Sequence, residues 1–230
     1  MREHDWNVSP KEAVELQKRL RADVLIAPLA RTPKTIAGAD VSLERFGTDL
    51  YAGIIVMSYP DLKPLCHSVV KLKVAFPYIP GLLSFREIPG LLECLGKLPI
   101  KPDLIVVDGQ GIAHPRGMGI AVHLGALTGM PTIGCAKSRL YGTYREPKAV
   151  GQVEPIHDPN TGALLGYALK SKARSNPLMV SPGNSIDADG SLAIVRSCLR
   201  GYRLPEPTRR AHLLVNAFRR GEIESGAKLY

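Results

Sequence analysis

Two short apolar segments that each end in an aspartate constrain this chain most. Thr35–Asp40 reads TIAGAD, and Asp103–Asp108 reads DLIVVD before the sequence GQG. Both have the length and apolar content of buried strands. If the strands lie side by side, Asp40 and Asp108 meet at one edge of a sheet, where a buried carboxylate pair is costly unless a cation neutralises it. The sequence therefore predicts a cation site with oxygen ligands, which suit Mg²⁺ or Mn²⁺.

The spacing of apolar residues predicts the other elements. In chain order they are a capped helix at 9–25, strands at 35–41, 50–58 and 66–74, helical pieces at 81–87 and 91–98 separated near Pro89, a strand at 103–107, a helix at 119–128, strands at 131–136, 152–154, 164–170 and 178–181, and helices at 189–199 and 208–220. Three successive strands followed by alternating helices and strands predict an α/β fold. Its mixed sheet would join an antiparallel three-strand meander to parallel strands, with helices on its faces. We expect one domain over residues 1–230, since no repeat or long linker interrupts the pattern.

Charge and cysteine content narrow the function classes. Lys and Arg outnumber Asp and Glu by 30 to 21, a net charge of +9. This favours a nucleic-acid partner over the alternative of a generally basic surface. The four cysteines form no Cys-x-x-Cys pair and lie in apolar stretches, so we expect buried thiols in a cytoplasmic protein. We also expect a monomer with no signal peptide and no membrane span.

Two further residues join the aspartates through their order in the chain. Glu87 lies on the first helical segment after the meander and His212 on the last predicted helix, and each alone would be an exposed helix residue. The order of Asp40, Glu87, Asp108 and a late helical ligand resembles that of the ribonuclease-H-like nuclease superfamily. Those folds hold two divalent ions that stabilise both oxygens of an in-line phosphoryl displacement.

Longer strings narrow the resemblance. They are IAGADVS from Ile36, FPYIPGLLSFRE from Phe76, DGQGIAHPR from Asp108, GCAKSRLYG from Gly134 and LPEPTR from Leu204. Together they resemble the endonuclease V family, which repairs deaminated bases, over about residues 10–220. The resemblance implies a DNA repair endonuclease that hydrolyses the second phosphodiester bond 3′ to deoxyinosine, leaving 3′-hydroxyl and 5′-phosphate ends.

The resemblance also implies roles at the phosphate. Asp40, Asp108 and Glu87 would hold Mg²⁺, with Mn²⁺ as a substitute. His212 would be an outer ligand or would assist the attacking water, and Lys137 would lie near the scissile phosphate. An ordinary strand-end lysine is the alternative for Lys137.

A second group of residues is implied to contact the damaged base. Tyr78, between two prolines, would be an aromatic wedge that fills the stack after the base is extruded, the alternative being a packed surface tyrosine. A pocket with a donor to O6 and an acceptor for N1–H would select hypoxanthine over adenine. The other residues implied to contact DNA or the lesion are Pro80, Gly81, Leu82, Gly111, His114 and Lys137.

Two other functions stay open at this point. One is an endoribonuclease of the same family that cuts at inosine in RNA, and the other is a non-catalytic nucleic-acid-binding protein. One departure from the family pattern is Asn184, which stands where members often carry His. Asparagine forms hydrogen bonds but does not titrate, so we expect no proton transfer at this position.

Overall fold

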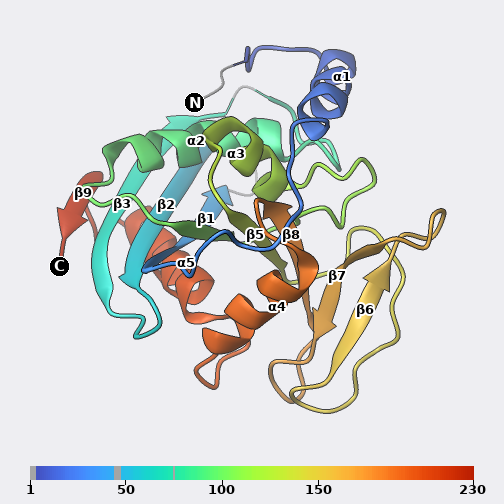
Figure 1. Cartoon of the computed structure of the whole chain (residues 1–230). Coiled ribbons are helices and arrows are strands. Elements are labelled where there is room, and N and C mark those ends of the chain that lie inside the picture. The colour runs from blue at the N-terminus through green and yellow to red at the C-terminus, as the bar shows by residue number, and fades with distance from the viewer. Residues whose placement is uncertain (1–3, 44–47, 75) are drawn as a thin grey trace.

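The computed structural model describes residues 4–43, 48–74 and 76–230, and its centre is one mixed sheet (Figure 1). The strands, in chain order, are β1 (Thr35–Leu43), β2 (Asp49–Ser58), β3 (Pro64–Lys73), β4 (Leu104–Val107), β5 (Thr132–Ala136), β6 (Val153–His157), β7 (Leu164–Leu169), β8 (Leu178–Asn184) and β9 (Gly226–Leu229). Their order across the sheet is β6-β7-β8-β5-β4-β1-β2-β3-β9. The predicted mixed α/β sheet is therefore confirmed, including the antiparallel meander β1-β2-β3 and the parallel pairs β1–β4 and β4–β5.

Helices cover both faces of this sheet. They are α1 (Pro10–Arg21), α2 (Ser84–Lys97), α3 (Ile120–Thr128), α4 (Ala188–Ser197) and α5 (Glu206–Arg219). Figure 1 shows α2 and α3 on one side of the sheet and α4 and α5 on the other. One apolar cluster joins α2 and α3 to β1, β2 and β4, and another joins α4 and α5 to the opposite face. Alternate residues of a strand point to opposite faces. Ala37 and Ala39 accordingly pack in the first cluster and Ile36 in the second, which directs Asp40 towards α5.

The two aspartate-bearing segments are neighbours in the sheet, as predicted. β1 and β4 pair in parallel, with Ala39 opposite Val107. The pairing continues one residue further, because the amide of Asp108 donates to the carbonyl of Ala39 at 2.9 Å. Asp40 and Asp108 therefore emerge side by side at the carboxyl end of β4.

Two predicted helix boundaries were wrong. α1 begins with the predicted capping box of Ser9 and Glu12 but ends at Arg21 rather than near residue 25. Leu25 belongs to an extended segment, since its amide donates to the side chain of Asn184 and its carbonyl accepts from Ser185. α2 is one continuous helix with Pro89 inside it, rather than two pieces. Its buried apolar face against β2 and β3 outweighs the single backbone hydrogen bond that proline removes.

The carboxyl-terminal half also differs in detail from the prediction. β6 begins one residue later than the predicted segment and ends three residues later, at His157. β8 extends to Asn184 rather than ending at residue 181. The strand β9 was not predicted, because its four residues, GAKL, are too few to give a clear pattern. It pairs antiparallel with the edge of β3 and is held there by backbone hydrogen bonds.

The described part of the chain has no helix long and apolar enough to cross a membrane. The four cysteines are buried and free, as expected. Burial raises the pKa of the Cys94 thiol to about 12 and that of Cys198 to about 11, so neither is a reactive thiolate at neutral pH.

Candidate active site

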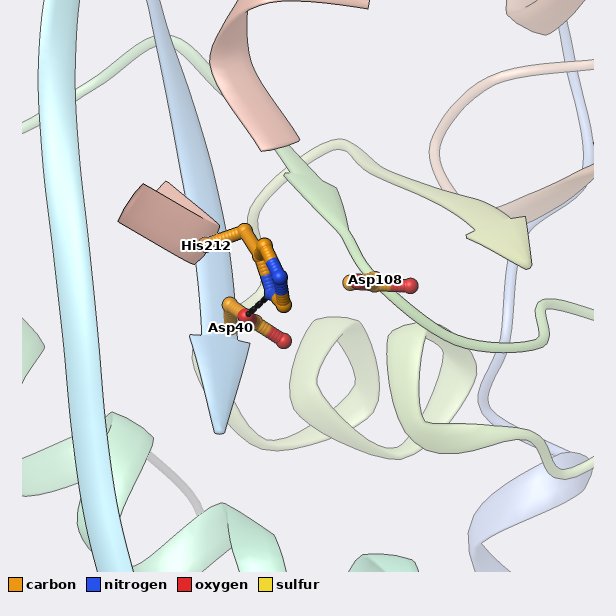
Figure 2. Close-up of side chains that lie close together, drawn as sticks. All are labelled: Asp40, Asp108 and His212. Atoms are coloured by element: carbon orange, nitrogen blue, oxygen red, sulfur yellow. Dashed lines mark hydrogen bonds and ion pairs between the residues drawn. The ribbon is translucent and has the colours of Figure 1, made fainter. Parts of the chain in front are cut away.

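Asp40 and His212 form a direct hydrogen bond at the boundary between β1 and α5. Figure 2 shows His Nδ1 facing Asp40 Oδ2, and the two atoms are 2.8 Å apart. On the other side of the ring, the Asn216 amide nitrogen donates to His212 Nε2 at 3.1 Å. Nε2 therefore accepts, and the proton of the neutral imidazole lies on Nδ1, which donates to Asp40. The helix position of His212 thus places it in the site rather than in open solvent.

Asp108 is paired with the side chain of Lys137, which follows β5. The Lys137 ammonium contacts Asp108 Oδ2 directly. Burial, followed by the negative charge of Asp40, raises the pKa of Asp108, and the nearby Lys137 opposes this shift. The two carboxylates keep only 8% of their side-chain surface, whereas Lys137 keeps 38% and His212 44%. The acids are thus held beneath partners that a substrate can reach.

Glu87 on α2 adds a third carboxyl to this region. Desolvation of the carboxyl, and then the charges of Asp40 and Asp108, raise the pKa of Glu87 to about 8. The shift thus reflects first the burial of the carboxyl and second the two neighbouring negative charges, which Arg86 offsets only in part. The described residues contain one group of possible metal ligands whose donor atoms all lie within 4.8 Å of one another, and it consists of Asp40, Asp108 and His212. Glu87 lies outside this group but close enough to sense its charge.

This donor set fits a divalent cation that prefers oxygen ligands. Two carboxylates converge, a third carboxyl is destabilised by their charge, and Lys137 supplies only one compensating positive charge. A bound cation would relieve that imbalance. Carboxylate oxygens are ligands that hard divalent cations prefer.

A cleft of about 380 Å³ is lined by Glu87, Asp108 and Lys137 and also by Tyr78 and Gly81 from the loop before α2. Asp40 and His212 are not among its lining residues. The remaining residues that line it are Pro80, Leu83, Ser84, Gly109, Gln110, His114, Met118, Gly119, Ile120, Ala136, Ser138, Arg139 and Leu140. The described residues have a larger hollow, about 1160 Å³, between the amino-terminal segment and α1, but it contains none of the predicted site residues.

Most residues that were implied to contact a base do line this cleft. The Tyr78 side chain is 68% exposed, with the Arg86 guanidinium 5.9 Å from its ring centre, so it is not a packed tyrosine. Leu82 does not line the cleft. Its side chain packs in the core with Phe85, and its amide donates to the carbonyl of Ile79 within the turn. The neighbouring Leu83 lines the cleft in its place, because successive residues of this turn point in different directions.

Gly111 lies behind the cleft wall rather than on it. Its amide donates to Ser181 Oγ at 2.9 Å, and a Cβ at this position would lie 2.2 Å from the carbonyl oxygen of Pro182. The glycine is thus required for close packing of the loop against β8. The neighbouring Gly109 and Gln110 line the cleft instead.

His114 is a loop contact. Its Nδ1 accepts from the amides of Arg116 at 3.1 Å and Met118 at 3.3 Å, so its Nε2 carries the proton and donates to the carbonyl of Gly81 at 3.1 Å. Burial, and then the charge of Arg116, lower the pKa of His114 to about 4. A neutral histidine that is saturated by loop partners holds two loops together and has no free donor for a phosphate.

Sequence reasoning missed three residues that complete these contacts. Asn216 orients His212, and Gln17 and Arg116 bind the carbonyl of Gly81. Asn216 lies four residues after His212 on a predicted helix, so helical spacing was an available signal. Gln17 had none, because a glutamine within an amphipathic helix ordinarily faces water.

Asn184 plays a structural part away from the cleft. Its side-chain oxygen accepts from the amide of Leu25 at 3.1 Å, and its side-chain nitrogen donates to the carbonyl of Met130 at 3.1 Å. Asn184 is thus fully used in joining β8 to two loops.

Comparison with known proteins points to one family. The endonuclease V family profile matches residues 17–213. Endonuclease V of Xanthomonas campestris pv. campestris (strain B100) is 46% identical over 222 residues, which are 95% of this chain and 92% of that protein. Endonuclease V of Gloeobacter violaceus is 42% identical over 224 residues, 94% of this chain and 89% of that protein.

Solved structures agree with the sequence comparison. Endonuclease V from Streptomyces avermitilis superposes with a TM-score of 0.86 at 36% identity, covering 95% of this chain and 96% of that one. The catalytic domain of human endonuclease V gives a TM-score of 0.84 at 30% identity, covering 93% and 98%. Ciona intestinalis endonuclease V, in complex with DNA containing an inosine followed by a ribo-adenosine, gives 0.82 at 26% identity, covering 93% and 98%.

Proposed function

Because the chain belongs to the endonuclease V family, we propose that it is a DNA repair endonuclease that acts at deaminated bases, chiefly deoxyinosine. It hydrolyses the second phosphodiester bond 3′ to the lesion and leaves 3′-hydroxyl and 5′-phosphate ends. The observation that carries the proposal is the cleft, whose lining combines the carboxyls of Glu87 and Asp108 with the exposed ring of Tyr78. A single cleft can thus contact both a scissile phosphate and a displaced base.

The acidic residues support phosphodiester hydrolysis. Asp40, Asp108 and Glu87 would hold Mg²⁺, with Mn²⁺ as a substitute. When bound, such an ion polarises the phosphate and lowers the pKa of a coordinated water. Asp40 fixes the His212 ring through Nδ1, so that Nε2 can orient the attacking water or take its proton when the water replaces the Asn216 amide at that atom. Lys137 neutralises Asp108 in the free protein and is near enough to contact a phosphate oxygen in the complex.

The exposed ring of Tyr78 supports recognition of an extruded base. Tyr78 extends into solvent from a segment in which Pro77 and Pro80 restrict the backbone. A ring held in this way loses little entropy when it enters a base stack. Gly81, Gly109 and Gln110 bring the backbone to the surface of the cleft, where hydrogen bonds to the edge of hypoxanthine can form.

A nicking assay tests the proposal. Duplexes that carry one deoxyinosine, uracil, abasic site or no lesion are incubated with the protein in Mg²⁺, Mn²⁺ or EDTA. We expect cleavage of the deoxyinosine strand, with both metals and not in EDTA, one nucleotide beyond the bond that adjoins the lesion. Specific binding without any nicking in either metal would instead favour a non-catalytic nucleic-acid-binding protein.

An inosine-specific endoribonuclease is a second candidate. The observation that favours it is the ribonucleotide after the inosine in the DNA bound by the Ciona protein. Matched strands with deoxyinosine in DNA, inosine in RNA, or a single ribonucleotide 3′ to deoxyinosine separate the two candidates. Faster cleavage of the RNA strand at equal enzyme concentration would assign the chain to RNA.

A further inference from the structure

The carbonyl oxygen of Gly81 is the meeting point of three side chains. Gln17 Nε2 donates to it at 3.0 Å, Arg116 Nη2 at 2.7 Å and His114 Nε2 at 3.1 Å. A carbonyl oxygen has two lone pairs, so three donors saturate it. Gly81 lies three residues after Tyr78 and lines the cleft, so these contacts hold the base of the segment that carries the exposed ring.

Gln17 is the member of this group that comes from a helix, whereas His114 and Arg116 lie in the loop between β4 and α3. It lies on α1, no residue of which is among the described residues that line the cleft. Its side chain is completely buried, a costly position for an amide without partners. Its oxygen accepts from Arg116 Nε at 2.6 Å, and its nitrogen also approaches the carbonyl of Met118 at 3.4 Å. Both ends of the amide are thus used to join α1 to two loops.

Arg116 depends on Gln17 for its orientation. The guanidinium is held at Nε by Gln17 and at Nη2 by Gly81, which sets its plane. Gly81 has a φ angle of +80°, and a Cβ there would lie 2.8 Å from Arg116 Nη2. Glycine therefore allows both the left-handed backbone and the close approach of the guanidinium.

Other contacts of the segment are the packing of Ile79 against an apolar cluster and the Arg86 guanidinium, 5.9 Å from the centre of the Tyr78 ring. Between Phe76 and Leu83 the segment contains no helix or strand, and Tyr78 itself makes no packed contact that buries its ring. Phe76 and Leu82 anchor the two ends in the core, but they do not set the peptide plane at Gly81. The three donors do so.

We propose that Gln17 is a positioning residue for base recognition. It acts through Arg116 and the Gly81 carbonyl to fix the position of the Tyr78 segment relative to the cleft wall. The inference rests on the proposed function. It assigns to α1, which is remote from the acidic group, a part in distinguishing a damaged duplex from an undamaged one.

The test compares Gln17→Met with the unaltered protein. Methionine has similar length but removes all three hydrogen bonds of the amide. We measure the affinity for a duplex with one deoxyinosine and for the matched undamaged duplex in EDTA, and cleavage in Mg²⁺ of duplex and single-stranded inosine substrates. A misplacement of about 1 Å caused by a distant mutation can cost about 10²-fold, and a smaller shift costs less. We therefore expect lesion discrimination and duplex cleavage to fall about tenfold, and single-strand cleavage by about threefold or less.

Two further variants keep the outcome interpretable. Gln17→Glu retains the acceptor for Arg116 and loses the donor to Gly81, so we expect an intermediate loss. Arg116→Lys perturbs the same contact from the other side, and we expect it to reproduce the Gln17→Met pattern if that variant fails to fold. Ser191→Ala is the matched control, because it removes a hydrogen bond from a buried hydroxyl on α4 to the backbone of Asp187, far along the chain from this loop.

The possible results separate this inference from the proposed function. If the unaltered protein neither prefers nor cuts inosine, the proposed function is wrong. If it does both, and the Gln17 and Arg116 variants keep the ratio of lesion to undamaged binding while only their melting temperatures fall as for Ser191→Ala, then Gln17 is a folding residue and this inference is overturned.

Discussion

At the scale of single residues, the three carboxyl groups of the site have different surroundings. Asp40 accepts from His212, Asp108 pairs with Lys137, and Glu87 senses the charge of both aspartates. Removing a charge therefore changes catalysis and stability in different ways at the three positions.

The aspartates should be essential for cleavage. We expect Asp40→Ala or Asp108→Ala to reduce Mg²⁺-dependent nicking by at least about 10³-fold, as for residues that act together as one catalytic unit. Binding to DNA should change little, because contacts to phosphate supply most of the affinity. Asp103→Ala is the control, since Asp103 precedes β4, at the opposite end of that strand from Asp108, and binds Arg31 and Thr35 there. Nicking at near-normal rates in either site variant would contradict the assignment.

Replacing Glu87 by glutamine should stabilise the metal-free protein by an amount that depends on pH. Its folded pKa of about 8 lies above the ordinary value, so ionisation of Glu87 destabilises the folded state. The penalty is absent below the unfolded pKa, grows as the pH rises from there, and is complete above about 8. Glu87→Gln should therefore raise the free energy of unfolding in EDTA at pH 9 more than at pH 6, as measured by urea denaturation. Adding Mg²⁺ should stabilise the unaltered protein most at the higher pH. An equal effect at both pH values would show that folding does not raise the pKa of Glu87.

Tyr78 should matter through its ring. Stacking on an aromatic side chain contributes roughly 1–3 kcal/mol per base, so Tyr78→Ala should weaken binding to the lesion duplex by about that amount. Tyr78→Phe should be nearly neutral, and single-stranded substrates should be less affected. Tyr230, which is 64% exposed at the carboxyl terminus, provides the control Tyr230→Ala. Unchanged discrimination in Tyr78→Ala would leave the wedge without support.

At the scale of elements, the site depends on how closely α5 approaches β1. A Cβ on Gly38 would lie 1.8 Å from the carbonyl oxygen of Pro207, so only glycine allows this contact. Asp40 is two residues further on the same face of β1, and His212 is on the same helix as Pro207. The distance between strand and helix therefore sets the hydrogen bond between Asp40 and His212.

Gly38→Ala tests that dependence. Overpacking of this kind costs about 1–3 kcal/mol, and occasionally more, because backbone on one side must move. We expect that loss in the free energy of unfolding together with reduced nicking, since His212 is carried away from Asp40. Gly96→Ala is the control, because a Cβ on this α2 residue meets nothing within 4 Å and alanine favours helix. Gly38→Ala with unaltered stability and activity would mean that α5 adjusts freely.

At the scale of the whole molecule, the net charge of +9 predicts how binding responds to salt. Affinity for undamaged duplex should fall linearly on a plot of log K against log salt concentration, with a slope of about −0.9 for each phosphate contacted. Arg139→Ala, at the cleft, should reduce the magnitude of that slope by about one. Lys18→Ala should not, because Lys18 pairs with Glu15 on α1. A flat response to salt would show that the excess charge does not bind DNA.

The order of elements and the pairing of β1 with β4 could be predicted from the sequence, because both follow from local alternation and the length of apolar runs. The same information placed Asp40 and Asp108 together, and helical spacing confined His212 to one late helix. Boundaries were less predictable. Leu25 continues the apolar pattern of α1 but is held in an extended segment by Asn184, a contact between residues far apart in the chain.

Only the tertiary structure decided which side chains share the cleft. Leu82 and Leu83 are chemically identical, yet one packs in the core and the other lines the cleft. Gln17 looks like a solvent-facing helix residue, yet it is buried against Gly81 and Arg116. Local periodicity determines the strands and helices, because backbone hydrogen bonds and side-chain direction repeat along the chain. The partners of a buried polar group are fixed by where those elements dock, since its hydrogen bonds join segments that are distant in sequence.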